Sequence, residues 1–305
     1  MGRLTLASAV LLIASAGAAQ NQEHFALAGG KYLLIYRNTP VNVRNSSIER
    51  VFILVHGLQR DGHVYYKSAY DATSDAGRLN STLVIAPQFH ACTDKPDAGE
   101  AFFACRGWSD GSTTPEFPLS SFTAMDQLLE GVADRSRFPR LKEIVLAGHS
   151  AGGQFVQRYA AANRIDGKLA VPIRYIVANP STYLYLDSWR PVATRCAEFD
   201  DYKFGLAKLD GYAAGTGADA IRAQYPRRNV TYVLGELDTT DEHNMDKTCP
   251  ATAQGPNRFA RGMAYSTRIR DSWHARHGVV KVPGCGHSAE CMYRSPNVRK
   301  VVFPD

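Results

Sequence analysis

Seven short runs of apolar and β-branched residues recur along the chain, with longer segments between them. The runs are apolar throughout instead of alternating with polar residues, which is typical of central strands covered on both faces. We expect each run to form one strand of a common sheet. The runs are residues 31–36, 50–56, 81–89, 141–148, 173–179, 230–235 and 279–283.

Three of the intervening segments have a helical pattern instead. Residues 122–136 place apolar side chains, from Phe122 to Val132, along one stripe of a helix. Residues 152–164 and 258–277 are the other two segments with this character. Because strands alternate with helices, the pattern predicts an α/β fold with a mainly parallel central sheet and helices on both faces.

Two stretches do not fit a simple strand–helix–strand crossover. Residues 90–120 are expected to form a long loop, and residues 180–229 form an insertion rich in aromatic residues. Long excursions of this kind often form lids or pocket walls. The alternative is that the aromatic side chains of 180–229 only pack the insertion against the body of the protein. The sequence leaves both interpretations open.

The first residues have the layout of a secretory signal peptide. Arg3 precedes an apolar run over residues 4–14, and the small residues Ala16, Gly17 and Ala18 follow it. This run is shorter than the roughly 20 residues that a membrane-spanning helix needs. We therefore predict cleavage after about residue 18 or 19, secretion to the extracellular space, and no stable membrane insertion. Residues 20–305 are then expected to form a single domain.

Six cysteines are an even number, and in a secreted chain this favours disulfides. No C-x-x-C spacing is present, so we expect no metal site. Six cysteines allow fifteen pairings. Proximity in the sequence favours two of the pairs and leaves the third, which gives Cys92–Cys105, Cys285–Cys291 and Cys196–Cys249.

The charge pattern argues against one class of partner. The formal net charge is +6, but the positive residues are scattered and form no basic stripe, so nucleic acid is not an expected partner. Three N-x-[ST] sequons are possible glycosylation sites on a secretory route, at Asn45, Asn80 and Asn229.

The strongest chemical signal is the segment 148–152, which reads Gly-His-Ser-Ala-Gly. It follows the strand predicted at 141–148 and precedes the helix predicted at 152–164. This is the context that a nucleophile on a sharp strand-to-helix turn requires, because glycines relieve crowding around the strained serine. Ser150 is therefore the candidate catalytic nucleophile.

A serine hydroxyl needs a base, and the base needs a carboxylate to orient it. His287 lies in a glycine-rich loop after the last predicted strand, where Cys285–Cys291 could brace it. Asp238 follows the strand at 230–235 and is the favoured acid, with Glu236 and Asp241 as rivals. The order serine, acid, histidine along the chain is the one found with this type of turn.

The tetrahedral intermediate of such a reaction needs backbone N–H groups that stabilise its oxyanion. One would come from Ala151, directly after the nucleophile. The second would come from the loop after the strand at 50–56, with Leu58 as the favoured residue and Gln59 as the alternative. His56 in the same loop is expected to have a structural role.

Together these segments resemble the α/β-hydrolase superfamily, and within it secreted lipases, cutinases and polyhydroxybutyrate-depolymerase-like esterases. The resemblance rests on VHGLQ, GHSAGG, LGELD and GCGHS and covers nearly the whole mature chain. It implies an α/β-hydrolase fold, a serine hydrolase that works through an acyl-enzyme intermediate, and no cofactor. Trp108, Tyr183 and Tyr185 are candidate walls of the substrate site.

The leading hypothesis is a secreted, monomeric carboxylic ester hydrolase with Ser150, Asp238 and His287 as its triad, acting on a small-molecule or polymeric ester. A serine peptidase or amidase of the same fold is the nearest alternative, because the same triad cleaves amides. A binding protein that kept the fold without catalysis is the second alternative. It is disfavoured because all three triad positions are filled.

Overall fold

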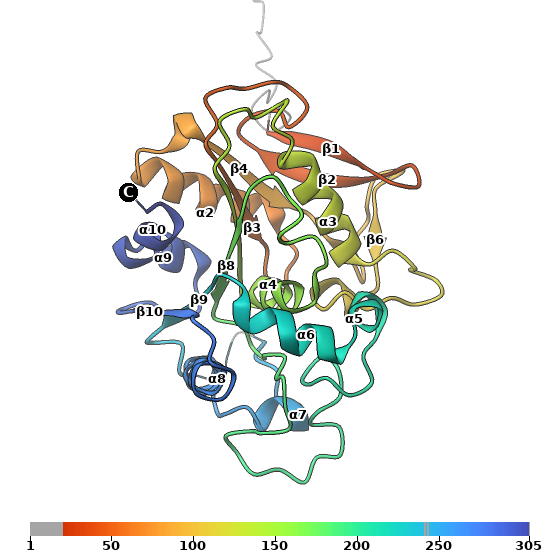
Figure 1. Cartoon of the computed structure of the whole chain (residues 1–305), viewed down its shortest axis with the longest axis vertical. Coiled ribbons are helices and arrows are strands. Elements are labelled where there is room, and N and C mark those ends of the chain that lie inside the picture. The colour runs from red at the N-terminus through yellow and green to blue at the C-terminus, as the bar shows by residue number, and fades with distance from the viewer. Residues whose placement is uncertain (1–20, 241, 243, 305) are drawn as a thin grey trace, which may run out of the picture.

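A computed structural model of the chain describes residues 21–240, 242 and 244–304. The predicted signal peptide at 1–19 and the rival acid Asp241 lie outside the described residues. The centre of the fold is an eight-stranded sheet in the order β1-β2-β4-β3-β7-β8-β9-β10 (Figure 1). Its strands are β1 (Gln22–Leu27), β2 (Lys31–Arg37), β3 (Arg50–Val55), β4 (Thr82–Pro87), β7 (Glu143–His149), β8 (Ile173–Ala178), β9 (Val230–Gly235) and β10 (Gly278–Val282).

The sheet is mainly parallel, as the sequence predicts. From β4 to β10 all neighbouring strands run parallel, while β1 and β2 form an antiparallel pair and β2 is antiparallel to β4. Because these strands are parallel, the carboxyl ends of β3, β7, β8 and β9 all lie at the same end of the sheet. Loops that follow these strands are the ones that can converge on a common site.

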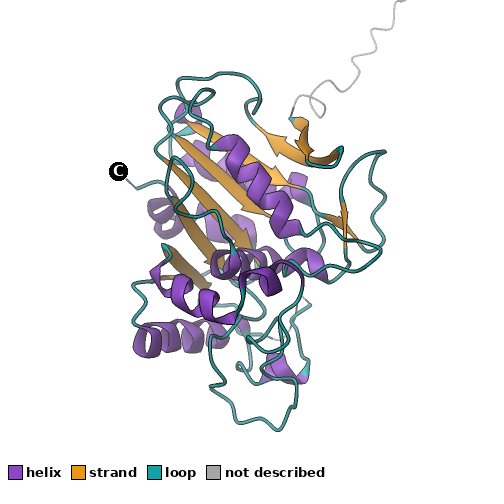
Figure 2. Ribbon diagram, turned by 45° about the vertical axis from the view of Figure 1, so that its right-hand side comes forward, coloured by secondary structure: helices purple, strands orange, loops and turns teal. Residues whose placement is uncertain are grey.

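Helices cover both faces, as Figure 2 shows. Side chains of β3 and β7 alternate between two cores, with Ile53 and Leu146 in the larger core and Phe52 and Val145 in the smaller. Residues of α3, α4 and α8 complete the larger core, and residues of α2, α9 and α10 complete the smaller. The helices are α2 (Gly62–Asp75), α3 (Ser121–Val132), α4 (Ala151–Ala162), α5 (Gly211–Thr216), α6 (Ala218–Gln224), α7 (Cys249–Thr252), α8 (Arg258–Trp273), α9 (Ala289–Arg294) and α10 (Pro296–Val302), and the 3₁₀ helices are η1 (Leu79–Ser81), η2 (Gly107–Ser109) and η3 (Tyr225–Arg227).

Several predicted boundaries need correction, and the helix expected at 122–136, for example, ends at Val132. The stretch 90–120 is not one loop, because it contains η2 and the small parallel pair β5 (His90–Ala91) and β6 (Phe102–Phe103). The helix expected at 258–277 ends at Trp273, because His274 adopts a left-handed conformation with φ of 51° and closes it.

The insertion 180–229 packs closely on the body of the protein. It contains α5, α6 and η3. Tyr183, Tyr185, Tyr212 and Tyr225 are buried in the larger core. The hydroxyl of Tyr212 donates to Asp126 of α3 at 2.7 Å. These aromatic residues attach the segment to the body, while Tyr202, Lys203 and Phe204 of the same segment line a cavity beside Ser150. The segment therefore supplies pocket wall as well as packing.

The six cysteines are joined in the pairs that sequence proximity favours, with Cα–Cα distances of 4.3 Å for Cys92–Cys105, 5.9 Å for Cys196–Cys249 and 5.8 Å for Cys285–Cys291. Three disulfides are compatible with an extracellular location. Among the described residues, no helix combines the length and the apolar character that crossing a bilayer requires.

Candidate active site

Ser150 lies at the turn between β7 and α4, in a strained conformation with φ of 60° and ψ of −122°. A non-glycine residue with positive φ is uncommon and often marks a functional site. The flanking glycines allow the turn, because a Cβ at Gly148 would collide with the carbonyl of Gly152, and one at Gly152 would collide with the carbonyl of Val55. The sequence therefore holds the serine on a turn that only small neighbours permit.

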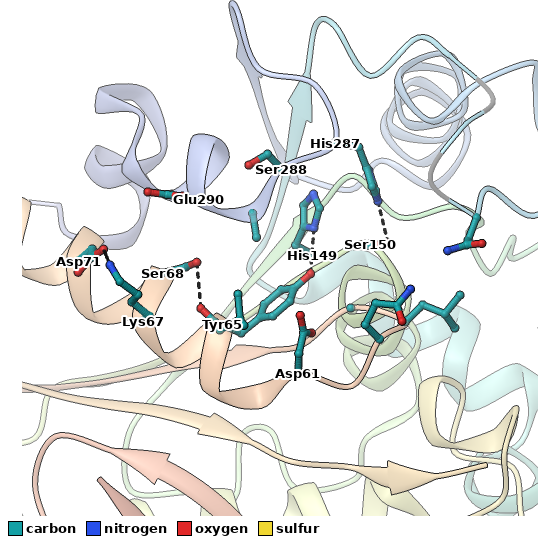
Figure 3. Close-up of a pocket in the computed structure, with 16 residues that line it drawn as sticks. Asp61, Tyr65, Lys67, Ser68, Asp71, His149, Ser150, His287, Ser288 and Glu290 are labelled. Carbon is teal, nitrogen blue, oxygen red and sulfur yellow. Dashed lines mark hydrogen bonds and ion pairs between the residues drawn. The ribbon is translucent and has the colours of Figure 1, made fainter. Parts of the chain in front are cut away.

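The structure brings Ser150, His287 and Asp238 together in one hydrogen-bonded chain. His287 Nδ1 lies 2.7 Å from Asp238 Oδ2. On the other side of the ring, His287 Nε2 lies 2.9 Å from Ser150 Oγ, as Figure 3 shows. A carboxylate can only accept a hydrogen bond, so Nδ1 carries the proton and donates to Asp238. Nε2 is then the acceptor for the serine hydroxyl. This is the arrangement in which a histidine can take the proton of a serine.

Asp238 has a second charged neighbour that the sequence did not reveal. Arg258 Nη1 lies 3.5 Å from Asp238 Oδ1, and both side chains are only 1% exposed. Burial lowers the pKa of Arg258, and the nearby carboxylate of Asp238 opposes that shift. Arg258 is the first residue of α8, and the Phe259 amide donates to the carbonyl of Asp238 at 3.1 Å. The start of α8 thus fixes the position of the acid.

The two predicted oxyanion donors, Leu58 and Ala151, belong to segments that adjoin Ser150. Ala151 is the first residue of α4, where backbone N–H groups have no partner within the helix. Leu58 follows Gly57 in a turn that the Arg60 amide closes on the Gly57 carbonyl at 3.1 Å. A Cβ placed on Gly57 would lie 3.7 Å from Ser150 Cβ, so this turn runs directly beside the nucleophile.

The turn at residues 57–60 is held by an ion pair that sequence reasoning also missed. Arg60 has φ of 55°, and its Nη1 donates to the Leu58 carbonyl at 2.8 Å. Its Nε and Nη2 donate to the two carboxylate oxygens of Asp94 at 2.6 and 3.0 Å. The Gln88 amide donates to the Arg60 carbonyl at 2.6 Å. Asp94 lies two residues after Cys92, so the first disulfide anchors this ion pair.

Two buried histidines support the same region in neutral form. His56 Nε2 accepts the Phe89 amide at 3.0 Å, and its Nδ1 donates to the Gly57 carbonyl at 3.0 Å. Burial lowers the pKa of His56 to about 4. His149 lies 3.3 Å from the Tyr65 hydroxyl, its ring packs 4.6 Å from that of His287, and burial lowers its pKa as well. His56 is thus structural, as the sequence suggests.

Two cavities meet at the nucleophile, since Ser150 and Leu58 line both of them. The larger, of about 810 Å³, also contains Trp108 and the Cys92–Cys105 disulfide in its wall. The smaller, of about 570 Å³, contains His287 and the start of α2. Tyr183 and Tyr185, expected to line the substrate site, line neither cavity because they are packed around Tyr265 in the larger core.

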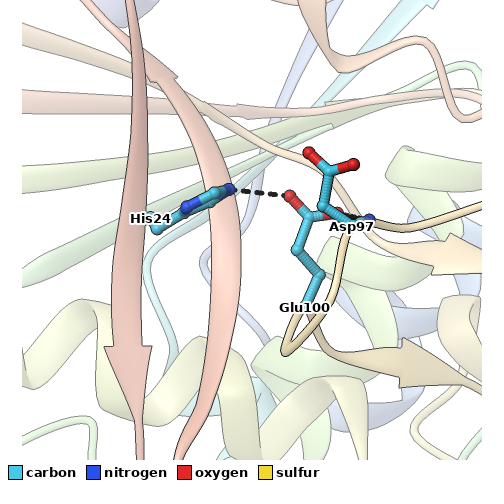
Figure 4. Close-up of side chains that lie close together, drawn as sticks. All are labelled: His24, Asp97 and Glu100. Atoms are coloured by element: carbon cyan, nitrogen blue, oxygen red, sulfur yellow. Dashed lines mark hydrogen bonds and ion pairs between the residues drawn. The ribbon is translucent and has the colours of Figure 1, made fainter.

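One group of potential metal ligands occurs in the described part of the chain, apart from both cavities. Nitrogen or oxygen atoms of His24, Asp97 and Glu100 lie within 4.8 Å of one another (Figure 4). The Glu100 carboxylate already accepts from His24 Nε2 at 2.8 Å and from the Asp97 amide at 3.0 Å. These hydrogen bonds explain why the three residues lie close together. The group lies at β1, which is an edge strand of the sheet.

The strand order and the turn carrying Ser150 define the α/β-hydrolase fold, and solved structures agree. The poly(3-hydroxybutyrate) depolymerase LpqC from Bordetella parapertussis superposes with a TM-score of 0.64 at 21% identity, over 90% of this chain and 85% of the other. Poly(aspartic acid) hydrolase-1 from Sphingomonas sp. KT-1 superposes with a TM-score of 0.65 at 22% identity, over 92% of this chain and 97% of the other. No protein-family model matches the sequence, and no curated protein matches it significantly.

Proposed function

We propose that this protein is a secreted serine hydrolase that cleaves carboxylic esters through the triad Ser150, His287 and Asp238. The observation that carries the proposal is the continuous chain of hydrogen bonds, 2.9 Å and 2.7 Å long, from a serine on a strained turn to a buried carboxylate. The two solved structures compared above are described as a poly(3-hydroxybutyrate) depolymerase and a poly(aspartic acid) hydrolase. Their fold supports the reaction class for this chain.

In the proposed first half-reaction, His287 Nε2 takes the proton of Ser150 as its oxygen attacks the ester carbonyl carbon. The resulting imidazolium is stabilised by Asp238, to which Nδ1 donates. The negative charge on the former carbonyl oxygen is stabilised by the amides of Leu58 and Ala151. When the carbon–oxygen bond breaks, His287 gives its proton to the leaving alcohol, and the acyl group remains on Ser150.

In the second half-reaction a water molecule replaces the alcohol. His287 takes a proton from this water, the hydroxide attacks the acyl carbon, and the same two amides stabilise the second oxyanion. Collapse returns the proton to Ser150 and releases the acid. No step requires a metal ion or a cofactor.

The remaining parts of the proposal concern processing and substrate size. Residues 1–19 would be removed as a signal peptide, and the sequons at Asn80 and Asn229 are exposed, whereas Asn45 is half-buried. The substrate is a small-molecule or polymeric ester, because the two cavities leave room for groups on both sides of the scissile bond. Trp108 would line the site for the acyl half.

The proposal is tested with the mature, oxidised protein and p-nitrophenyl esters from acetate to palmitate, with Ser150→Ala as the blank. We expect hydrolysis that depends on Ser150 and labelling of that serine by a fluorophosphonate probe. The best acyl length would measure the larger cavity. Folded protein that hydrolyses no ester, or that carries the label on another residue, would contradict the proposal.

A further inference from the structure

The smaller cavity lies on the side of the triad from which the leaving alcohol departs. His287 lines this cavity and does not line the larger one. Since His287 Nε2 must hand its proton to the alcohol oxygen, the alcohol half of the substrate lies next to His287 in the bound state. The larger cavity then takes the acyl half. Side chains in the smaller cavity are therefore placed to select the alcohol.

Asp61 is the unusual residue in this cavity. It occupies the N-cap position of α2, where an aspartate normally accepts hydrogen bonds from the first amides of the helix. Its side chain makes no such bond, and the Gly62 amide donates to Gln88 Oε1 at 2.9 Å instead. In Figure 3 the carboxylate extends from the start of α2 toward the hydroxyl end of Tyr65. Asp61 thus gives up a stabilising local contact.

Within the described residues, Asp61 also lacks the partners that its acidic neighbours have. Its Oδ1 is buried without a hydrogen bond, and no cation forms an ion pair with its carboxylate. By contrast, Lys67 lies 2.6 Å from Asp71, and Arg294 lies 3.3 Å from Glu290. Asp61 itself is half-buried and lines the smaller cavity, so a donor on a bound ligand meets a carboxylate that no cation of the described chain neutralises, and hydrogen bonds to charged groups are among the stronger ones.

We propose that Asp61 is a specificity-determining residue that binds a hydrogen-bond donor on the alcohol half of the substrate. A carboxylate only accepts hydrogen bonds, so its ligand is a hydroxyl or a protonated amine a few atoms from the ester oxygen. The substrate class is then an ester of a hydroxylated or amino-substituted alcohol, and not of a plain alkyl alcohol. This inference rests on the proposed function, because it assumes that Ser150 attacks an ester.

Two pairs of butyrate esters, each matched in shape, test the inference. The first pair is 2-hydroxyethyl and propyl butyrate, and the second is 2-(dimethylamino)ethyl and 3-methylbutyl butyrate. In the wild-type protein we expect the donor-bearing member of at least one pair to have a kcat/KM about tenfold above its partner, the size of one hydrogen bond to a charged group. A preference within the first pair would identify a hydroxyl as the ligand of Asp61, and a preference within the second pair would identify a protonated amine.

Two variants at the same position sharpen the test. Asp61→Leu should bring both ratios to about one, whereas Asp61→Asn should remove the preference for the amine and keep part of a preference for the hydroxyl. Asp71→Asn is the matched control, because Asp71 lines the same cavity but is paired with Lys67, and it should leave the ratios unchanged. Each ratio is measured within one variant, so partial loss of folded protein does not alter it.

The outcomes separate this inference from the proposed function. If all four esters are hydrolysed with equal kcat/KM within each pair, or if Asp61→Leu keeps the wild-type ratios, Asp61 does not select the alcohol. The proposed esterase function would not be affected by that result. If none of the four, and no p-nitrophenyl ester, is hydrolysed, the proposed function fails and the inference fails with it.

Discussion

The two loops that complete the site around Ser150 are held in different ways. The turn at residues 57–60 depends on side chains, since Arg60 joins the Leu58 carbonyl to Asp94 and Gln88 fixes the Arg60 carbonyl. The loop at residues 283–288 has no charged side chain of this kind and combines a backbone bond with uncharged contacts. The Leu237 amide donates to the Cys285 carbonyl at 3.0 Å. Asn179 Nδ2 adds a bond to the Gly286 carbonyl at 3.2 Å, and Cys285–Cys291 closes the loop.

This difference predicts which of the two loops a single substitution is more able to displace. A charged side chain with several partners can be removed by one mutation, and all of its bonds are lost together. Backbone hydrogen bonds survive most side-chain changes, so the loop that presents His287 should tolerate more substitutions outside the triad itself. The 57–60 turn is also expected to depend on pH, because His56 supports it.

The largest expected effect is on kcat, and it comes from replacing Asp238, the residue that orients His287. Asp238→Asn should lower kcat by a factor on the order of 10⁴, because the amide can stabilise the wrong tautomer of His287. The rival acid gives the control: Glu236→Gln should leave kcat within about twofold of the wild type, since the structure pairs His287 with Asp238. A larger loss from Glu236→Gln would mean that the acid has been misassigned.

A low pH should reduce the free energy of unfolding, because His56, which supports the turn at residues 57–60, is held in its neutral form in the folded protein. Its folded-state pKa of about 4 lies below the ordinary 6.5, so unfolding takes up a proton between these values. The stability is therefore complete above about pH 6.5 and falls as the pH drops toward 4, by about 2–3 kcal/mol for this one residue. Urea unfolding at pH 7 and pH 4.5 measures the loss. His56→Gln, which does not titrate, should reduce it, and an unchanged pH dependence would show that His56 is not responsible.

Removing the ion pair is the direct test of the same turn. Arg60→Gln should lower kcat by about 10²-fold with KM changed little, because a displaced Leu58 amide costs about as much as losing one oxyanion donor. Arg37→Gln is the matched control, since Arg37 at the end of β2 forms an ion pair of 2.7 Å with Glu23 at similar burial. Neither of these two residues lines a cavity at Ser150. Equal losses in both variants would point to stability and not to the turn.

The smallest effect is expected from the cross-link of the 283–288 loop. Replacing Cys285 and Cys291 by alanine opens a loop of six residues and should cost about 2 kcal/mol of unfolding free energy, with kcat lowered only severalfold. Opening Cys92–Cys105 in the same way should cost about 3 kcal/mol and lower kcat further, because Asp94 would lose its anchor. If the two double variants had equal kcat, the contrast between the loops would not extend to their disulfides.

The central strands were predictable because they are buried on both faces and therefore apolar throughout. The strand β1 was not, since its sequence QEHFAL places exposed and half-buried positions in turn along an antiparallel edge. The helix α2 was also missed. Its buried side includes Ser68 and Thr73 beside Tyr65 and Tyr66, so no apolar stripe marks it.

The hydrogen-bonded group of Ser150, Asp238 and His287 was predictable for a related reason, because each of the three residues follows a strand and has a local sequence signal. Arg258 and Asp94 had no such signal, since each acts through a partner that is distant in sequence, Asp238 and Arg60 respectively. Asp61 had none either, because only the fold places it in a cavity beside Ser150. Tyr183 and Tyr185 show the converse limit. An aromatic residue fits a pocket wall and a packed core equally well, and only the fold places these two in the core.

The strand β10 ends the sheet and leaves one edge that another polypeptide could extend. Lys281 stands exposed in the middle of this strand, and Asn297 Nδ2 of α10 donates to its carbonyl at 3.4 Å. A charge and an occupied acceptor are the features by which natural sheets discourage edge-to-edge polymerisation. This edge is therefore expected to resist the addition of a strand from a second copy of the chain.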